Sequence, residues 1–396
     1  MYVTIAAKKY GNCPEYQGAE MKVPATKEAI GDAMERARVP AEGEYRMTAF
    51  RDWPDFLKER LARMEAEVRE VSFLAGQVCR MDPKSLSEYE GVLACREAER
   101  GDQECSMKDL INAAYNLENF DFLPGIVKDT DLGENALDGD CVRILQGLPE
   151  EVIGLLDAAK VGAYLRQLEK GAFTKEGYCF PSGGDWQEIY DGHDLPEKES
   201  KTEVLLSIRM ENRGCPEDGD AWLSLPCSKE KLLSVCRQLG AESFRQCRIT
   251  DVVSLAPILE EQIGPDEDFR ALNRLAERLG QMTPKELVKY KAVLEFDRWK
   301  SVERSLWLAD HLEDYVFDPS QVIYEGYGKE CLKNLGVDCS DPAFEKFDFY
   351  QYGRAQYEKA GMKLTSYGAV SMEQEPELLE TQDDSLQMGR CTCQTM

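Results

Sequence analysis

The chain of 396 residues holds few of the side chains that usually perform catalysis. Its two histidines are His193 and His311, and neither lies beside a repeated serine, cysteine or aspartate partner that would suggest an activated nucleophile. We interpret His311 as a structural or surface residue. The sequence contains no glycine-rich phosphate-binding loop of the usual kinds. We therefore expect no catalytic residues and do not predict an enzyme.

Two short patterns resemble metal sites without completing one. Residues 391–393 form a Cys-x-Cys pair, and no second pair completes a zinc site. Asp129, Asp131 and Asp140 stand at positions one, three and twelve of a calcium-binding loop. Position six is Glu134, where the sharp turn needs glycine, and position twelve is usually the longer glutamate. We expect neither a metal nor a cofactor.

Acidic side chains are the most abundant candidate binding groups. The chain has 74 aspartates and glutamates against 48 lysines and arginines, which gives a net charge of −26 and a pI of about 4.6. A nucleic acid, itself a polyanion, finds no basic surface on such a chain. We therefore exclude nucleic acid as a direct ligand and expect a basic partner.

The acids are concentrated in two stretches. Residues 109–157 contain eleven acidic and two basic residues, and residues 310–348 contain ten acidic and three basic residues. Both stretches also contain aromatic residues and glycines, so we expect folded surface rather than a plain acidic tail. The predicted partner-binding surface consists of Asp109, Glu118, Asp121, Asp129, Asp131, Glu134, Asp138, Asp140, Asp157, Asp310, Glu313, Asp314, Asp318, Glu325, Glu330 and Asp348.

The elements that must position these acids occur twice. Residues 74–94 and 275–295 share nine identities at a constant offset of 201 positions, and most of the shared residues are apolar and at helical spacing. Such a pattern is typical of the core-facing surface of a duplicated fold. The acidic excess is rebuilt in the same part of each copy although the individual acids have moved, which favours selection for an electrostatic field. The alternative is a solvated face that only confers solubility.

The repeat predicts an α+β fold of two tandem copies of an elongated unit, each with a small α+β subdomain, a helical middle and an acidic α+β end. We assign residues 1–180 to the first copy and residues 203–370 to the second. Residues 181–202 have the glycine, proline and charge content of a linker. Residues 371–396 are acidic, polar and aperiodic, which predicts a disordered tail.

Local signals predict several elements of the first copy. Residues 2–8 alternate as a strand does. Thr26 and Ser106 are placed to cap helices, and Pro83 suits the first turn of a helix.

The remaining composition predicts a soluble, cytoplasmic protein. No apolar run approaches the roughly 18 residues that span a bilayer, and the N-terminus lacks the long apolar stretch of a signal peptide. We expect no contact with a membrane. The fourteen cysteines are sparse, and several lie in periodic segments as small hydrophobic residues. We interpret them as reduced thiols.

Several segments resemble the ArdA-type antirestriction proteins. Together they cover nearly all of the first copy and, more weakly, the second. The central signature of that family is similar to two consecutive segments, and the opening strand and the closing part of the chain are similar as well. The matching segments are Asn116–Gly125, Lys128–Gly133, Tyr2–Ala7, Val23–Pro24, Tyr352–Arg354 and Leu364–Val370.

The resemblance implies a function and a partner. Proteins of that family are elongated α+β DNA mimics carried on mobile genetic elements, and they occupy the DNA-binding groove of type I restriction-modification enzymes. Duplex DNA has one charge per about 1.7 Å of axis, so 26 net charges correspond to roughly 45 Å of duplex. Family members usually pair as homodimers of one unit. For two joined copies we expect an intrachain pseudo-dimer, monomeric in solution, with its contact through residues 150–180 and 340–370.

Two other functions remain open from the sequence. An acidic adaptor would bind another basic DNA-binding protein, such as a histone-like protein, through one compact patch. An enzyme would need a concave pocket with a few convergent groups of perturbed pKa. A mimic instead predicts a continuous track of carboxylates on an extended body.

Overall fold

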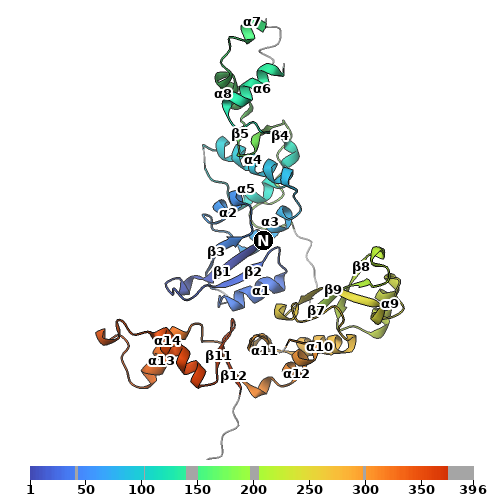
Figure 1. The fold of residues 1–396 in the computed structure, drawn as a ribbon, viewed down its shortest axis with the longest axis vertical. Helices are drawn as coiled ribbons and strands as arrows, with labels where there is room; N and C mark the ends of the chain where they lie inside the picture. Colours follow the sequence, from blue (N-terminus) through green and yellow to red (C-terminus); the bar gives the residue numbers. More distant parts are fainter. Residues whose placement is uncertain (41–42, 102, 140–149, 197–204, 298–299, 373–396) are drawn as a thin grey trace, which may run out of the picture. The chain divides into compact units, whose positions relative to one another are not determined.

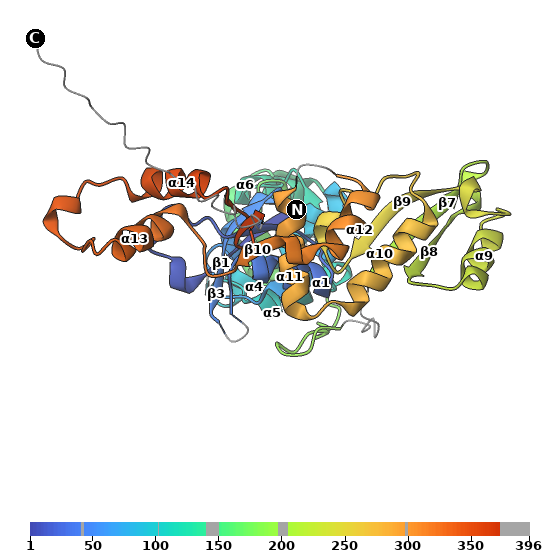
Figure 2. The ribbon, with the colours of Figure 1, turned by 90° about the horizontal axis from the view of Figure 1, so that it is seen from below.

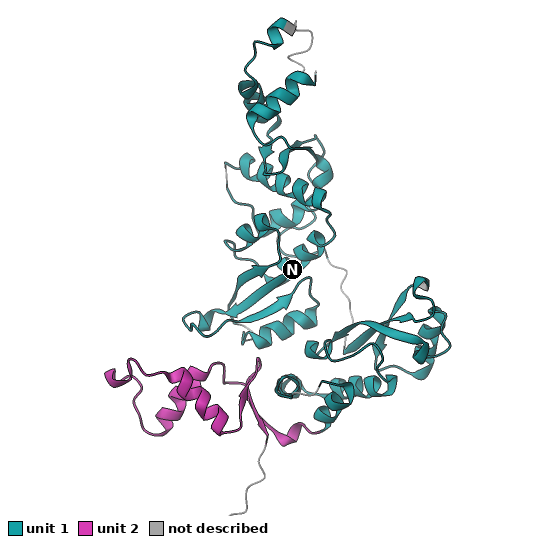
Figure 3. Ribbon diagram, viewed as in Figure 1, with its two compact units in different colours: residues 1–310 teal, residues 311–396 magenta. Residues whose placement is uncertain are grey.

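The protein has a mixed α+β structure with four three-stranded sheets among the residues that its computed structural model describes (Figure 1). These residues are 1–40, 43–101, 103–139, 150–196, 205–297 and 300–372. The chain divides into two compact units, residues 1–310 and residues 311–396 (Figure 3). The division lies inside the second predicted copy, so the predicted copy boundaries stay a prediction.

The N-terminal sheet is antiparallel and has the strand order β2-β1-β3. Its elements are β1 (Tyr2–Ala7), the 3-10 turn η1 (Lys8–Tyr10), β2 (Ala19–Lys22), α1 (Lys27–Arg36) and β3 (Tyr45–Arg51). The predicted strand is confirmed as β1, in which Val3 and Ile5 are fully buried. Thr26 caps α1 as predicted, because its hydroxyl accepts a hydrogen bond from Ala29 N.

A second antiparallel sheet repeats this arrangement with the strand order β8-β7-β9. Its elements are β7 (Leu206–Asn212), η3 (Pro216–Asp218), β8 (Asp220–Leu225), α9 (Lys229–Gln238), η4 (Phe244–Gln246), β9 (Cys247–Ser254) and η5 (Pro257–Leu259). Ser228 caps α9 by accepting from Lys231 N, as Thr26 caps α1. In both sheets the register shifts once between the first strand and the third.

Helices follow each of these sheets. In the first half of the chain they are α2 (Asp55–Leu61), α3 (Val68–Val78), α4 (Pro83–Glu99) and α5 (Met107–Ala113). After β9 and η5 they are α10 (Phe269–Gln281), α11 (Pro284–Phe296) and α12 (Val302–Asp310). Pro83 opens α4 and Ser106 caps α5, both as predicted.

The residues shared by the two central stretches form the helical cores. Tyr89 of α4 is fully buried and donates from its hydroxyl to Leu110 O at 2.7 Å. Tyr290 of α11 is also fully buried and donates to Ser305 O at 2.9 Å. In each case the tyrosine bonds the helix that follows. The shared residues at helical spacing therefore correspond to a core surface, because the equivalent tyrosines are buried in both halves.

The chain then forms two further sheets, each with a pair of helices. The first has the order β4-β6-β5 and comprises η2 (Leu117–Asn119), β4 (Phe120–Pro124), α6 (Asp129–Asp138), α7 (Glu150–Ile153), α8 (Ala158–Glu169), β5 (Ala172–Phe173) and β6 (Gly177–Pro181). The second, in the unit of residues 311–396, has the order β10-β12-β11. It comprises η6 (Leu312–Asp314), β10 (Tyr315–Asp318), α13 (Tyr324–Asn334), η7 (Pro342–Phe344), α14 (Phe349–Lys359), β11 (Lys363–Leu364) and β12 (Ala369–Met372).

Glycines set the close approach of the helices in both pairs. A Cβ on Gly162 of α8 would lie 1.8 Å from Asp129 O of α6. A Cβ on Gly353 of α14 would lie 1.9 Å from Tyr324 O of α13. Only glycine allows the two backbones to approach this closely. The strand β12 extends to Met372, and the predicted tail from residue 373 onward lies outside the described residues.

Part of the predicted linker is held against α5. Asn112 Oδ1 accepts from Ile189 N at 2.8 Å and from Tyr190 N at 2.9 Å, and its Nδ2 donates to Tyr190 O at 2.8 Å. Tyr190 is 2% exposed and belongs to the main hydrophobic core. We call residues 182–196 the strap.

A second asparagine holds the strap one turn later. Asn116, which is fully buried, donates to Gln187 O and accepts from Gln187 N, both at 2.8 Å. These two amides hold residues 187–190 by satisfying backbone hydrogen bonds, and the prediction that residues 181–202 form a linker stays a prediction. The rest of that range lies in residues 197–204, outside the described residues.

No helix within the described residues is long and apolar enough to cross a membrane. The eleven cysteines among these residues are all free thiols, in agreement with the interpretation of the sequence.

Candidate functional site

Four acids of the predicted surface are exposed and unpaired in the unit of residues 1–310. They are Glu118 in η2, Asp121 in β4, and Glu134 and Asp138 in α6. None of the four side chains forms an ion pair with another described residue. We call these four residues the first acidic set.

Two acids of the predicted surface in the other unit are exposed, and their side chains form neither an ion pair nor a hydrogen bond with another described residue. They are Glu313 and Asp314 in η6, and we call them the second acidic set. Glu313 lies just before β10, and Glu118 lies just before β4. One exposed acid, Glu118 or Glu313, therefore recurs at the same point in the order of elements, after the last central helix and before the first strand of the following sheet. Asp121, Glu134 and Asp138 have no counterpart in the second acidic set.

Three predicted acids of the first stretch are engaged within the fold. Arg166 of α8 donates to both carboxylate oxygens of Asp129, with Nε to Oδ1 at 2.8 Å and Nη2 to Oδ2 at 3.2 Å. The hydrogen bonds that Arg166 donates to Asp129 raise the pKa of Arg166. Asp131 lies 3.4 Å from Lys128 Nζ, and Asp157 caps α8. These carboxylates are partly neutralised before any partner arrives.

Asp109 is buried and does not belong to the surface. It is 7% exposed, and Arg100 donates to both of its oxygens at 2.6 and 2.7 Å. Burial opposes the charged form of Asp109, but the bonds from Arg100 and Ser106 outweigh it and lower its pKa to about 2. A count of charges along the sequence could not reveal this pair, since Arg100 precedes the acidic stretch.

Acids of the second stretch have local partners as well. Asp310 lies 2.7 Å from Arg278 Nε. Asp318 accepts from Ser320 N at 2.8 Å, and Asp348 caps α14. These carboxylates order the turns and helix ends of their own unit.

Of the last three predicted acids, one forms an ion pair, one accepts a hydrogen bond and one lies outside the described residues. Glu325 forms an ion pair with Lys329 one turn later on α13. Glu330 is exposed and accepts from Gln321 Nε2 at 3.1 Å. Asp140 lies outside the described residues.

The calcium-like pattern is helical. Asp129 and Asp131 lie in the first turn of α6, and the helix continues to Asp138 instead of forming a loop around an ion. Within the described residues, no three histidine, cysteine or acidic side chains are grouped as metal ligands.

Exposed apolar residues form a feature that the sequence interpretation missed. Tyr164 and Leu168 lie one turn apart on α8 and are 50% and 64% exposed, and Leu155 just before the helix is 86% exposed. The buried side of α8 is marked by Gly162 and Leu165. The four-residue spacing of Tyr164 and Leu168, which places both residues on one face of a helix, could have indicated this surface from the sequence. Both residues lie in the range predicted for contact between copies.

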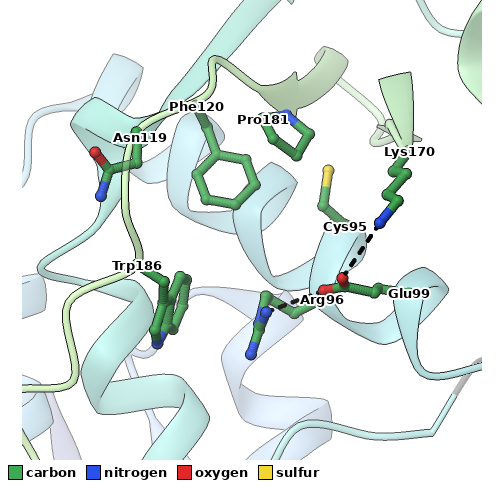
Figure 4. A pocket seen from close by; sticks show the side chains of 9 residues that line it. Cys95, Arg96, Glu99, Asn119, Phe120, Lys170, Pro181 and Trp186 are labelled. Carbon is green, nitrogen blue, oxygen red and sulfur yellow. Dashed lines mark hydrogen bonds and ion pairs between the residues drawn. The ribbon is translucent and has the colours of Figure 1, made fainter. Parts of the chain in front are cut away.

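One cavity of about 240 Å³ lies between α4 and the strap (Figure 4). Arg96 lies over the ring of Trp186 at 4.3 Å from its centre, and Phe120 meets the same ring edge to face. Glu99 pairs with Arg96 at 3.0 Å and with Lys170 at 3.8 Å. The charges of these three side chains thus have partners. The free thiol of Cys95 also lines the cavity and donates to Cys179 O at 3.1 Å.

Comparison with known proteins gives no family for this chain. No protein-family model matches it, and no curated protein matches it significantly. Its function must therefore be argued from its own residues.

Proposed function

We propose that the protein is an antirestriction protein that acts as a DNA mimic and occupies the DNA-binding groove of a type I restriction-modification enzyme. In this role it binds a protein, not nucleic acid, and performs no chemistry. Lysines and arginines that line a DNA groove would pair with its carboxylates and release their counterions, as they do with phosphates. This function places it in the cytoplasm, where restriction enzymes meet incoming DNA.

The observation that carries the proposal is an exposed acid that recurs in the two acidic sets. Glu118 in η2 and Glu313 in η6 stand at corresponding points of the element order, directly before β4 and β10. These carboxylates are exposed and have no ion pair in the described part of the chain. They are therefore available to a basic partner, whereas acids such as Asp129 are already paired.

We also propose that the chain is two tandem copies of one unit. The equivalent strand orders, the buried Tyr89 and Tyr290, and the glycine crossings at Gly162 and Gly353 all support this arrangement. The two halves place the same residue type, tyrosine or glycine, at the same structural position. Shared ancestry of the two halves accounts for them together.

Two copies on one chain would replace the homodimer that a single copy needs. The exposed Tyr164 and Leu168 lie within residues 150–180, where the contact between copies is expected. The corresponding range, residues 340–370, contains the exposed Phe347. We propose that these apolar surfaces associate within one chain, so that the protein is a monomer in solution. Sedimentation of the full chain tests this, and a stable dimer of chains contradicts it.

A competition assay tests the proposed function. A labelled target duplex is bound to a purified type I restriction-modification complex, and the protein is titrated against it. The wild type should displace the duplex. A variant with all six acids of the two sets changed to their amides should displace it far less well, because the groove loses the exposed carboxylates that have no partner within the described residues.

A control variant separates local from total charge. It carries six amide changes at exposed, unpaired acids outside the two sets: Glu59, Glu65, Asp185, Asp194, Glu217 and Glu242. It has the same net charge as the test variant and should still displace the duplex. Equal loss in both variants would show that only net charge matters. Binding to a histone-like protein without competition at the restriction enzyme would favour the acidic adaptor.

A further inference from the structure

A lysine of α11 is buried against α1, although the two helices belong to different proposed copies. Lys291 is 2% exposed. Its Nζ lies 3.1 Å from Asp32 Oδ1 and 2.7 Å from Glu35 Oε2, both on α1. The helices lie side by side in two views (Figures 1 and 2). A buried ammonium group is costly unless opposite charges surround it, so the contact depends on these acids.

Opposite charges meet in this contact. Asp32 is 3% exposed and also accepts from Arg36 Nε at 2.9 Å, so it is shared by a base of its own helix and by Lys291. Glu35, which is partly exposed, is the second acid. Asp32 thus lies between Arg36 and Lys291, and η5 packs against both α1 and α11 beside them. Glu260, which directly follows η5, is a further acid whose charge interacts with that of Asp32. Removal of one partner leaves a buried charge uncompensated.

The equivalent positions carry different charges in the other copy. At the offset of 201, Lys291 corresponds to Glu90 on α4. The caps Thr26 and Ser228 align α1 with α9 at an offset of 202, so that Asp32 corresponds to Ser234 and Glu35 to Arg237.

These replacements decide which pairings are favourable. The same contact between two first copies would bring Glu90 against Asp32 and Glu35, three acids with no lysine. The same contact between two second copies would bring Lys291 against Arg237. Both arrangements are repulsive, and like charges across an interface exclude the wrong partner.

We propose that the surface around Asp32 and Glu35 on α1 is a selective docking surface whose partner is the Lys291 surface of the second copy, and that it rejects a second first copy. The inference rests on the proposed tandem arrangement and not on DNA mimicry. It adds a contact distinct from the apolar surfaces of α8. It also explains why a charged lysine, rather than an apolar residue, occupies a buried position.

Charge exchange in the full-length protein tests the proposal, with amide hydrogen exchange of α1 as the readout. Lys291→Glu places three acids together, and Glu35→Lys places two lysines together. Each variant should increase the rate of amide hydrogen exchange in α1 about tenfold, because α11 would no longer cover that helix. The double variant restores opposite charges and should bring exchange back toward the wild-type rate.

Lys285→Glu is the matched control, since Lys285 is exposed on the same helix and its charge change is identical. If Lys291→Glu speeds exchange no more than this control, or if the double variant exchanges as fast as the single ones, the proposal is overturned. Should Lys291→Glu fail to fold, Glu35→Lys is combined with Lys291→Met, which removes the repulsion. Rescue then supports the contact and lack of rescue overturns it. No restriction enzyme enters these measurements, so they fail or succeed independently of the proposed function.

Discussion

Tyr190 donates a hydrogen bond from its hydroxyl to Glu70 Oε1 at 2.8 Å, across 120 positions of sequence. The other oxygen of Glu70 accepts from Glu67 N and completes the capping box of α3. Burial and the adjacent Glu70 carboxylate raise the pKa of Tyr190, so its hydroxyl keeps its proton as a donor. The strap is thus joined to the start of α3 as well as to α5.

Asn112→Ala should release the strap. Asn112 is 2% exposed and makes three hydrogen bonds to the strap backbone, so its loss should lower the free energy of unfolding by about 3 kcal/mol. Limited proteolysis should then cut within residues 182–196 well before the wild type is cut there. Asn135→Ala, at an exposed position of α6, is the control. Equal proteolysis of both variants would show that the strap is held by other contacts.

Asp109→Asn should destabilise the junction of α4 and α5. The two bonds from Arg100 are charge-assisted, so we expect a loss of about 2 kcal/mol at neutral pH. The pKa of Asp109 is about 2 in the fold and 3.8 as a reference. Its charge therefore stabilises the fold above about pH 4, and this contribution is lost as the pH falls toward 2. Urea unfolding from pH 7 to pH 2 should show the difference between wild type and variant shrinking below pH 4; a constant difference contradicts this.

Two glycines of the second unit should respond oppositely to alanine. A Cβ on Gly353 would lie 1.9 Å from Tyr324 O, so Gly353→Ala must separate α13 from α14 and should cost about 3 kcal/mol or more. Gly326 of α13 has only Ile323 near its Cβ position, at 3.7 Å. Gly326→Ala should stabilise the helix by about 0.5–1 kcal/mol. Thermal unfolding of the two variants checks both signs, and similar effects would mean that the helices are not in close contact.

Binding through the acidic sets should be distributed over many carboxylates. Each exposed ion pair contributes on the order of 0–1 kcal/mol, so Asp121→Asn alone should hardly change inhibition of the restriction enzyme. Asp129→Asn should be nearly silent too, since Asp129 is already paired with Arg166. Inhibition should weaken steeply as salt is raised. A single carboxylate that proves indispensable would point to a specific site instead of a mimic.

Local structure was predictable at positions where the residue type strongly favours one place in a helix. Thr26, Pro83 and Ser106 open helices because their side chains or fixed backbone angle suit the first turn. The strap was not predictable in this way. Its glycines and charges resemble a linker, and the residues that hold it, Asn112 and Asn116, lie about seventy positions earlier.

The candidate site was predictable as a region but not residue by residue. The charge count located the acidic stretches, yet it could not separate the exposed Glu118 from the buried Asp109. That distinction depends on Arg100 and on packing, which are set by the tertiary structure. The burial of Lys291 could not be predicted from the sequence for the same reason, because a lysine on a helix is normally solvated.

The strap also shortens the tether between the proposed copies. Nine residue steps separate Pro196 from Leu205, and at about 3.6 Å per residue they reach no farther than about 32 Å. Surfaces confined by so short a connection meet at an effective concentration in the millimolar range. A contact with a dissociation constant of about 1 mM between separate molecules would therefore be substantially formed within one chain. In the proposed tandem arrangement, Asn112 and Asn116 would therefore favour association of the copies, because the residues that they hold no longer lengthen the connection between the copies.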